Sequence, residues 1–288
     1  MEKVIANQNF DEERALYHLK DTVVEHCRFS GPADGESVLK EARNIKVKNC
    51  SFSLRYPLWH DEGFELIDSS MDELTRAPIW YASRGRMINC DIHGIKCLRE
   101  CQDIDVAYSH IHSPEFGWKC RQIHVQDSEI ESEYLFLDSS DVLVDNLKMK
   151  GKYSFQYMHH LEIKNSVLDT KDAFWHSTNV TVRDSIVKGE YLGWFSDGLT
   201  LINCRITGTQ PLCYCKNLKL VNCIMEETDL AFEYSDVDAD IDGNILSVKN
   251  PKSGIIRADS IGQIILEDSI MESQARIVTS KSGLQLKI

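Results

Sequence analysis

The stretch LINCRI at residues 201–206 is followed, 19 residues later, by LVNCIM at residues 220–225. Both share one pattern: an apolar residue, any residue, Asn or Asp, a small residue, any residue and a second apolar residue. Copies continue upstream at this spacing as far as Met87, which makes seven successive steps of 19 residues. A fixed period of this kind is the sequence signature of a solenoid, in which each repeat packs only against its neighbours.

The first apolar residue of each copy marks one repeat along the chain. These marker residues are Ile5, Val24, Val47, Leu66, Met87, Val106, Val125, Val144, Ile163, Val182, Leu201, Leu220, Ile241 and Leu266. Outside the regular region the steps are 19, 23, 19, 21, 21 and 25 residues, which is typical of one coil with short loop insertions. The copy at Ile241 is degenerate.

Within each copy, apolar and polar residues alternate, as in residues 160–165, and this is the period of a β-strand. A helical solenoid needs a longer repeat that contains two helices. The fixed leucines of a leucine-rich repeat are absent, and 19 does not fit the left-handed hexapeptide coil. The sequence therefore predicts an all-β fold, a right-handed parallel β-helix of about 14 coils of about 19 residues.

We expect a single domain over residues 1–288. Residues 1–23 would form an N-terminal coil and cap, residues 24–270 the stacked coils, and residues 271–288 a C-terminal cap or tail. The ends of such a stack must be covered, because open strand edges pair with other strands. The terminal segments or a second subunit can do this, so a homo-oligomer formed through coil ends is also an expectation.

The composition limits the partners of the chain. With 45 Asp and Glu against 32 Lys and Arg, the net charge is -13, which disfavours nucleic acid and anionic membrane surfaces. No apolar run is long enough to span a membrane, and residues 1–8 lack the basic start and apolar stretch of a signal peptide. Ten cysteines without a CxxC motif or zinc-finger spacing indicate a reducing compartment. We therefore expect a cytoplasmic protein without cofactor or metal.

In a β-helix, residues one period apart stack on each other, so each position of the repeat forms a column. The third position of the pattern is Asn or Asp in 11 of 14 copies, as expected at a bend where short polar side chains tolerate a left-handed backbone. The next column is mostly Cys or Ser and holds half of the ten cysteines. We interpret these cysteines as buried space-filling residues, with disulfides or a metal site as the alternatives.

Another column contains all five tryptophans of the chain. It consists of Tyr17, Lys40, Trp59, Trp80, Arg99, Trp118, Leu137, Gln156, Trp175, Trp194, Cys213 and Phe232. Either the rings stack and stabilise the coils through buried apolar area, or they line a shallow groove and pack against sugar rings. Charged residues seldom lie unpaired in a core, so the interruptions by Lys40 and Arg99 favour partial exposure. The candidate ligand-binding residues are Lys40, Trp59, Trp80, Arg99, Trp118, Trp175 and Trp194.

The column beside the tryptophans is polar and supplies the candidate catalytic residues Glu100, Asp138 and His176. Glycoside hydrolysis with inversion needs two carboxyl groups about 6.5–9.5 Å apart. Glu100 and Asp138 lie two coils apart, roughly 9.6 Å at the usual strand spacing, although with Lys119 between them they also fit a ladder of alternating charges. His176 is a candidate acid or base, and the alternative is a surface histidine without a chemical role.

Several longer strings resemble those of a known family. They are ERAL (13–16), DGES (34–37), YPLW (56–59), DAFW (172–175), GEYLGW (189–194), LAFEYS (230–235) and NPKSG (250–254). Over nearly its whole length the chain resembles a bacterial family of uncharacterised proteins, the domain of unknown function 3737. That family is similar in fold to the pectin-lyase-like right-handed β-helices, so the resemblance implies this fold. It implies no established activity and no functional residues.

Two functions remain open at this point. The first is a protein that binds or processes an oligosaccharide along the aromatic-lined face, a hydrolase or lyase if it is an enzyme. The alternative is a non-enzymatic scaffold or protein-interaction module, because stacked stripes of side chains offer an extended surface. Exposed indole rings beside a carboxylate pair would favour the first function, whereas fully buried rings would remove its main support.

Overall fold

The computed structural model describes residues 3–31, 35–280 and 285–287, with side chains described up to residue 280. The fold is a β-solenoid of about 14 turns of about 19 residues, and nearly all of its strand pairs are parallel, which confirms the predicted parallel β-helix. The ends of the predicted caps, residues 1–2, 281–284 and 288, lie outside the described residues. The described part of the chain has no helix that is long and apolar enough to cross a membrane.

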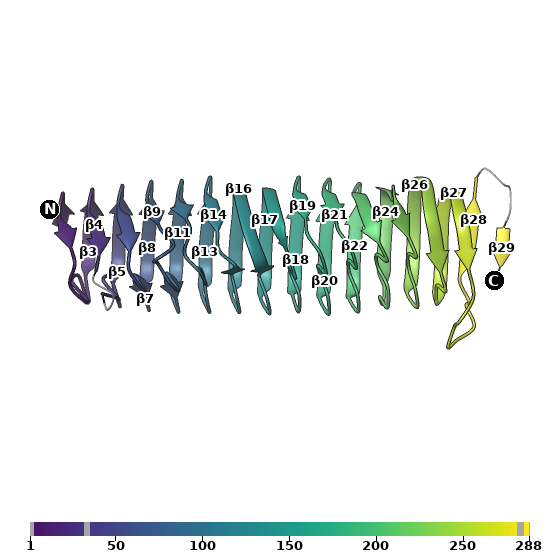
Figure 1. Cartoon of the computed structure of the whole chain (residues 1–288), viewed down its shortest axis with the longest axis horizontal. Coiled ribbons are helices and arrows are strands. Elements are labelled where there is room, and N and C mark those ends of the chain that lie inside the picture. The colour runs from purple at the N-terminus through teal and green to yellow at the C-terminus, as the bar shows by residue number, and fades with distance from the viewer. Residues whose placement is uncertain (1–2, 32–34, 281–284, 288) are drawn as a thin grey trace. The chain divides into compact units, whose positions relative to one another are not determined.

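The chain forms two compact units, Met1–Lys148 (unit 1) and Met149–Ile288 (unit 2). Within each unit, strands of successive coils lie side by side (Figure 1). The strands that begin in unit 1 are β1 (Lys3–Ala6), β2 (Asn9–Phe10), β3 (Lys20–Glu25), β4 (Arg28–Ser30), β5 (Arg43–Lys48), β6 (Ser51–Ser53), β7 (Leu58–Trp59), β8 (Glu62–Ile67), β9 (Ser70–Met71), β10 (Ile79–Trp80), β11 (Ser83–Ile88), β12 (Asp91–Ile92), β13 (Gln102–Ala107), β14 (His110–His112), β15 (Glu115–Phe116), β16 (Arg121–Leu135) and β17 (Ser140–Lys152).

Unit 2 repeats the same alternation of a long and a short strand. Its strands are β18 (His159–Lys164), β19 (Val167–Asp169), β20 (Thr178–Arg183), β21 (Ile186–Lys188), β22 (Asp197–Ile202), β23 (Arg205–Thr209), β24 (Leu218–Ile224), β25 (Thr228–Asp229), β26 (Asp236–Lys249), β27 (Ser253–Ile265), β28 (Arg276–Thr279) and β29 (Gln285–Lys287). At the C-terminal end, β29 pairs antiparallel with β28.

The pairing register confirms that residues 19 apart are neighbours in adjacent coils. In unit 2, Val182 pairs with Leu201 and Leu201 with Leu220. In unit 1, Met87 pairs with Val106. The predicted markers therefore form continuous rows from Ile5 to Val125 in unit 1 and from Ile163 to Leu220 in unit 2. The last two markers are wrong: Leu220 pairs with Ala239 and Ala239 with Ile256, so Ile241 and Leu266 do not continue the row. The register shift in β26 and the longer loops of these last coils break the simple period.

These rows form the interior of each unit. The marker residues Val47, Leu66, Met87 and Val106 are completely buried, and burial of each such side chain contributes about 1.5–3 kcal/mol. Buried phenylalanines stack in a second row, for example Phe155 on Phe174 with ring centroids 5.5 Å apart.

Bends that carry Asn or Asp after a long strand are built as the sequence predicts. Asn203 donates from Nδ2 to Oδ1 of Asp184 at 2.9 Å, and Asn89 bonds to Asp68 in the same way in unit 1. Asn203 and Asn89 both have a φ of 53°, in the left-handed region that Asn tolerates. These hydrogen bonds join one coil to the next, which confirms a structural role for the column.

The cysteines fill space inside the coils. All ten have free, buried thiols. Burial raises the pKa of Cys90 to about 11 and that of Cys215 to about 11, so these thiols stay protonated and unreactive at neutral pH.

Candidate functional site

The tryptophans lie at one corner of the coil, shortly before each long strand; Trp59 and Trp80 end the short strands β7 and β10. Trp59 pairs in register with Trp80, Trp80 with Arg99, and Arg99 with Trp118, so the predicted column exists in unit 1. In unit 2, Trp175 and Trp194 stack with ring centroids 5.4 Å apart. All five indoles are half-buried. Their exposure is therefore intermediate between that of a fully buried stack and that of an exposed groove, the two interpretations of the sequence.

The backbone turns outward directly after this column. His60, Tyr81, His176 and Phe195 have φ values of 61°, 54°, 54° and 60°. This left-handed conformation directs the side chain that follows each tryptophan position toward solvent. Because most bends of the chain contain such a residue, the conformation belongs to the coil and is not by itself a sign of a functional site.

The ring faces in unit 1 are covered by the chain's own groups. Lys40 Nζ lies 4.3 Å from the ring centroid of Trp59, and the Trp59 and Trp80 rings stack at 6.0 Å. The Arg99 guanidinium lies between two indoles, 5.6 Å from the ring of Trp80 and 5.2 Å from that of Trp118. Such cation–π contacts stabilise the corner and account for the two cations in an aromatic column.

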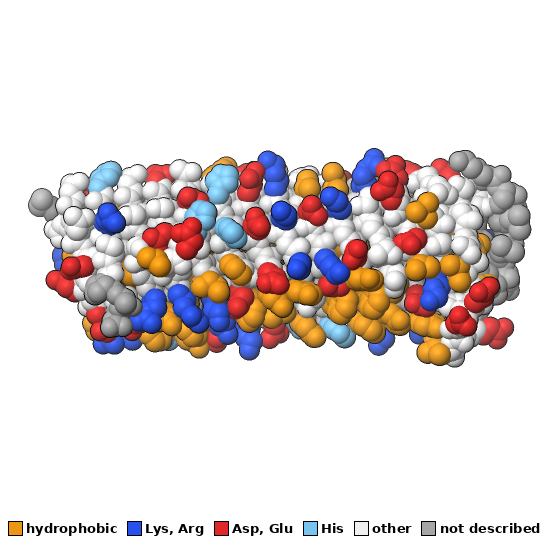
Figure 2. All heavy atoms as spheres, viewed as in Figure 1, with side chains coloured by type: hydrophobic (Ala, Val, Ile, Leu, Met, Phe, Trp, Pro, Cys, Tyr) orange, Lys and Arg blue, Asp and Glu red, His pale blue; other side chains and the backbone are white. Residues whose placement is uncertain are grey.

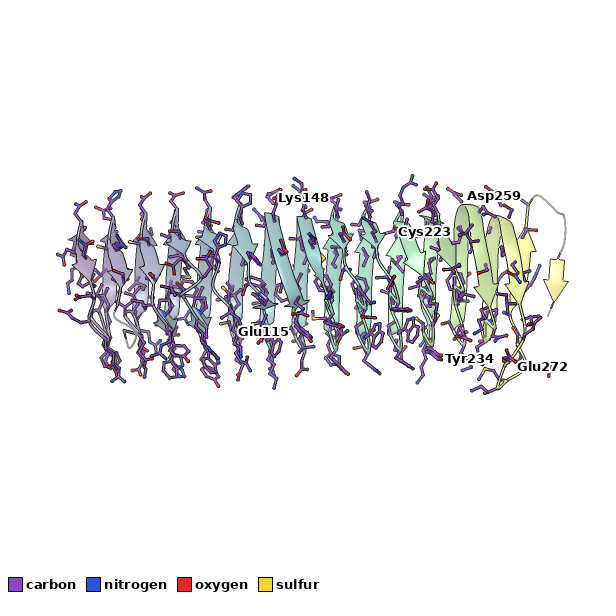
Figure 3. The ribbon with its side chains drawn as sticks, viewed as in Figure 1. Glu115, Lys148, Cys223, Tyr234, Asp259 and Glu272 are labelled. Atoms are coloured by element: carbon purple, nitrogen blue, oxygen red, sulfur yellow. The ribbon has the colours of Figure 1, made fainter. Side chains whose placement is uncertain are left out.

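Carboxylates surround Arg99. Glu100 Oε1 lies 3.8 Å from its Nε, and Glu115 Oε2 lies 3.7 Å from its Nη1. Lys96 also approaches Glu115, at 3.7 Å. Glu115 lies at the lower edge of unit 1 in the view of Figure 3. Sequence reasoning did not single out Glu115, which the fold brings to the corner from strand β15.

The candidate catalytic residues occupy two places. Backbone hydrogen bonds from Glu100 to Trp118 and from Lys119 to Leu137 put Glu100, Lys119 and Asp138 on successive coils of unit 1. The backbones at Glu100 and Asp138 are thus two strand spacings apart, roughly 9.6 Å, with Lys119 on the coil between them. His176 belongs to unit 2 and stacks between two aromatic rings of that unit.

The polar column of unit 2 is a continuous ladder of four rings, which we call the outer ladder: Tyr157, His176, Phe195 and Tyr214. The first three rings are exposed and Tyr214 is half-buried. Successive ring centroids are 5.1, 5.0 and 4.8 Å apart, and the interplanar angles do not exceed 14°. Tyr157 is 48% exposed and Phe195 is 44% exposed. Because each ring face is covered by its neighbour, the ladder presents ring edges to solvent. In Figure 2, hydrophobic side chains gather along the lower edge of unit 2, below β18 to β22.

The two tryptophans of unit 2 support this ladder from behind. Trp175 Nε1 donates to the carbonyl of Tyr191 at 2.6 Å, and Trp194 Nε1 donates to that of Gln210 at 2.7 Å. Both indoles are therefore fixed to the backbone of the following coil. The pKa of Tyr214 is raised, first by its partial burial and then by the charge of Glu233, so its phenol stays protonated at neutral pH.

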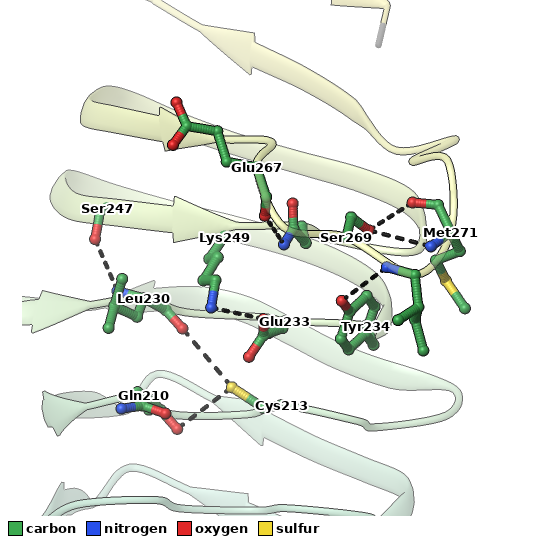
Figure 4. A network of polar contacts seen from close by, with 12 residues as sticks. Gln210, Cys213, Leu230, Glu233, Tyr234, Ser247, Lys249, Glu267, Ser269 and Met271 are labelled. Carbon is green, nitrogen blue, oxygen red and sulfur yellow. Dashed lines mark hydrogen bonds and ion pairs between the residues drawn. The ribbon is translucent and has the colours of Figure 1, made fainter.

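A loop that contains Ser269 and Met271 lies against Tyr234, one coil beyond the end of the outer ladder (Figure 4). Tyr234 packs on Tyr214 with ring centroids 5.7 Å apart, and its hydroxyl accepts a hydrogen bond from the N–H of Ile270 at 3.2 Å. Beside it, Lys249 Nζ lies 2.9 Å from Glu233 Oε1, and this hydrogen bond raises the pKa of Lys249. The ladder thus ends at a fixed polar cluster.

A groove that the sequence did not reveal lies on another side of unit 2. In the view of Figure 3, Cys223 marks the upper side near this groove, whereas Tyr234 lies at the lower edge. The groove has a volume of ≈ 400 Å³ and is lined by Asp184, Ser185, Ile186, Asn203, Cys204, Arg205, Asn222, Ile224 and Asp242. Its only sequence signal is the degenerate copy at Ile241, where the bend pattern is lost.

Comparison with known proteins gives a family and several structures of low similarity. A search among curated proteins finds no match. PfbA, a surface adhesin of Streptococcus pneumoniae, is 9% identical, with 99% of this chain and 92% of the adhesin covered and a TM-score of 0.45. The catalytic domain of a GH87 alpha-1,3-glucanase in complex with tetrasaccharides is 9% identical, with 98% of this chain and 64% of the glucanase chain covered and a TM-score of 0.41. This chain thus spans 64% of that domain.

A mannuronic acid specific polysaccharide family 6 lyase from human gut microbiota is 8% identical, with 98% of this chain and 82% of the lyase covered and a TM-score of 0.35. None of these similarities assigns an activity to this chain. The family profile described as "Protein of unknown function (DUF3737)" matches residues 3–279. Since that match spans nearly the whole sequence and agrees with the resemblance of its longer strings, the chain belongs to the DUF3737 family.

Proposed function

We propose that this protein binds an oligosaccharide along the outer ladder of unit 2. The supporting observation is the continuous row of stacked rings from Tyr157 to Tyr214, one residue per coil, of which Tyr157, His176 and Phe195 are exposed and Tyr214 is half-buried. Sugar rings combine apolar C–H surfaces with hydroxyl groups. The strip offers the matching chemistry, since the edge of Phe195 is apolar and phenol and imidazole groups lie on either side of it.

The stacking of the rings decides how the ligand is held. Because the ring faces cover one another, a sugar cannot stack on them and instead lies across their edges. Tyr157, His176 and Tyr214 then supply hydrogen bonds, while Trp175 and Trp194 hold the ladder in place. In unit 1, Lys40 and Arg99 occupy the faces of Trp59, Trp80 and Trp118, so we place the ligand on unit 2.

The proposed activity is binding without hydrolysis. A glycosidase needs one carboxyl group that keeps its proton and a second that is ionised. Lys119 lies on the coil between Glu100 and Asp138, and Glu100 Oε1 lies 3.8 Å from Nε of Arg99. The column therefore fits a ladder of paired charges better than an acid and base pair.

The test is a glycan-array screen followed by titration of the best ligand against matched variants. Phe195→Ala should weaken binding at least tenfold, or about 1.4 kcal/mol. Tyr81→Ala is the control, because Tyr81 is a 41% exposed ring of the same column in unit 1, stacked on His60. An absence of glycan binding, or equal losses in both variants, would contradict the proposal. If the protein released reducing ends from the glycan, its activity would be hydrolysis and not binding alone.

A second candidate function is a non-enzymatic interaction module. The observation that favours it is the loop beside Tyr234, where Ile270 is 86% exposed, because exposed apolar residues next to aromatic ones are typical of protein interfaces. Association of copies through coil ends belongs to the same proposal. Sedimentation velocity over a wide concentration range should then show a dimer, whereas a monomer at every concentration would contradict it.

A further inference from the structure

The groove of unit 2 has a defined structural origin. In β24 and β26, Leu220 pairs with Ala239 but Cys223 pairs with Ile241, so β26 has one residue fewer than β24 at the bend. The side chain that would stack on Asn222 is therefore missing. A local register shift of this kind ends a regular row and is common beside binding sites. The hollow that remains has a volume of ≈ 400 Å³, within the range of roughly 300–1,000 Å³ for small-ligand pockets.

The row of side-chain hydrogen bonds along the bend column ends at Asn222. Two acceptor groups at this end have no donor among the described residues. Asn203 donates to Asp184 at 2.9 Å, and Asn222 donates to Asn203 at 2.9 Å. Each amide thus donates toward the preceding coil and accepts from the following one. Among the described residues nothing donates to Oδ1 of Asn222, and no hydrogen bond or ion pair engages the exposed carboxylate of Asp242.

The other lining residues set the charge and shape of the groove. Arg205 forms an ion pair with Glu226, so its charge is already balanced. The carboxylates of Asp184 and Asp242 then make the groove negative, which repels phosphate, sulfate and carboxylate groups. Ile186, which is 41% exposed, and Ile224 provide apolar walls.

From this arrangement we infer that the groove is a second saccharide site, which binds a neutral sugar residue through its hydroxyl groups. Hydroxyls supply the donors that Asn222 and Asp242 lack, and the C–H surface of the sugar packs against the two isoleucines. This site shares no residue with the outer ladder. The inference therefore goes beyond the proposed function and can fail independently of it.

The test uses saturation-transfer NMR and calorimetric titration of the full chain with maltose, cellobiose, lactose and chitobiose. Asp242→Ala removes an exposed carboxylate without a described partner, so folding should be unaffected. Asn222→Gly removes the amide while keeping access to the φ of 52°. Each variant should weaken the binding of at least one disaccharide about tenfold, or about 1.4 kcal/mol.

Asn89→Gly is the matched control, because Asn89 makes the same bond to Asp68 in unit 1 and has a φ of 53°. This control should bind the disaccharide as the unchanged protein does. The inference is overturned if none of the four disaccharides binds, if Asn89→Gly weakens binding equally, or if calcium chloride alone occupies the groove. Loss of binding in Phe195→Ala but not in Asp242→Ala would overturn the groove site and leave the ladder proposal standing.

Discussion

Asp61 is a carboxyl group in a column where the neighbouring coils place uncharged and mostly small residues. It is 1% exposed, its Oδ1 accepts the N–H of Ala42 at 3.1 Å, and its Oδ2 has no hydrogen-bond partner among the described residues. Cys120 and Ser139 occupy the same column in later coils and donate to backbone carbonyls. Burial raises the pKa of Asp61 well above its usual value, so the fold favours the protonated, neutral form of this side chain.

This residue makes stability depend on pH. Above about pH 4 the unfolded chain has lost the Asp61 proton that the folded protein retains. The stability that the protonated form contributes is therefore complete below that pH and is lost as the pH rises through the folded-state pKa. Asp61→Asn, which keeps the acceptor and cannot ionise, should raise the free energy of unfolding at pH 8 by about 1–3 kcal/mol.

Denaturant titrations at pH 5 and pH 8 check this expectation. The increase in the free energy of unfolding caused by Asp61→Asn should be smaller at pH 5 than at pH 8. The control is Asp103→Asn, because Asp103 is an exposed aspartate of the same unit with a φ of 59°. This substitution should change the free energy of unfolding only slightly, and by the same amount at pH 5 and pH 8. A variant Asp61→Asn that is less stable than the unchanged protein at pH 8 would refute the assignment.

The indole N–H groups distinguish two otherwise similar tryptophans. Trp194 donates to the carbonyl of Gln210 at 2.7 Å, whereas Nε1 of Trp80 is buried without a partner among the described residues. Replacement by phenylalanine removes a hydrogen bond only at Trp194. Thermal or denaturant unfolding should therefore show a larger loss for Trp194→Phe than for Trp80→Phe, by about 1 kcal/mol. Equal losses would mean that the Trp194 bond contributes nothing to stability.

At the scale of the coil, close stacking depends on glycine at the end of a short strand. A Cβ on Gly189 would lie 1.4 Å from the carbonyl oxygen of Thr170 in the coil before it, and its φ is +148°. Gly189→Ala should therefore destabilise unit 2 by about 3 kcal/mol. Gly243 also has a positive φ, of +91°, but a Cβ added there would meet nothing within 4 Å. Gly243→Ala should therefore lower the free energy of unfolding clearly less than Gly189→Ala does. Denaturant unfolding that shows a larger loss for Gly243→Ala would contradict this account of the packing.

The columns were accessible to sequence reasoning because a constant period fixes which residues are neighbours. The 19-residue step predicted that Trp175 and Trp194 would lie together, and they do, 5.4 Å apart. The period does not fix how far a side chain tilts, so the covering of ring faces by Lys40 and Arg99 could not be read from it. The groove depends on one missing residue in β26, a change that the sequence shows only as a weak copy of the repeat.

At the scale of the whole molecule, charge limits the ligand. The net charge is -13, and the outer ladder contains no Lys or Arg that could bind an acidic group, so an uncharged glycan is favoured over an acidic one. Binding that depends on hydrogen bonds and apolar contact is little affected by salt screening. The dissociation constant of the best glycan should therefore change by less than about twofold between low and high salt. A strong loss of affinity with salt would indicate an ionic ligand.

The most direct measurement is fluorine NMR of the DUF3737 protein labelled with 5-fluorotryptophan. The chain has five tryptophans, and single Trp→Phe variants assign their resonances. Addition of the best glycan should shift the resonances of Trp175 and Trp194, which lie behind the outer ladder, and leave those of Trp59, Trp80 and Trp118 in place. Shifts confined to the unit 1 tryptophans, or none with any glycan, would contradict a saccharide on the outer ladder.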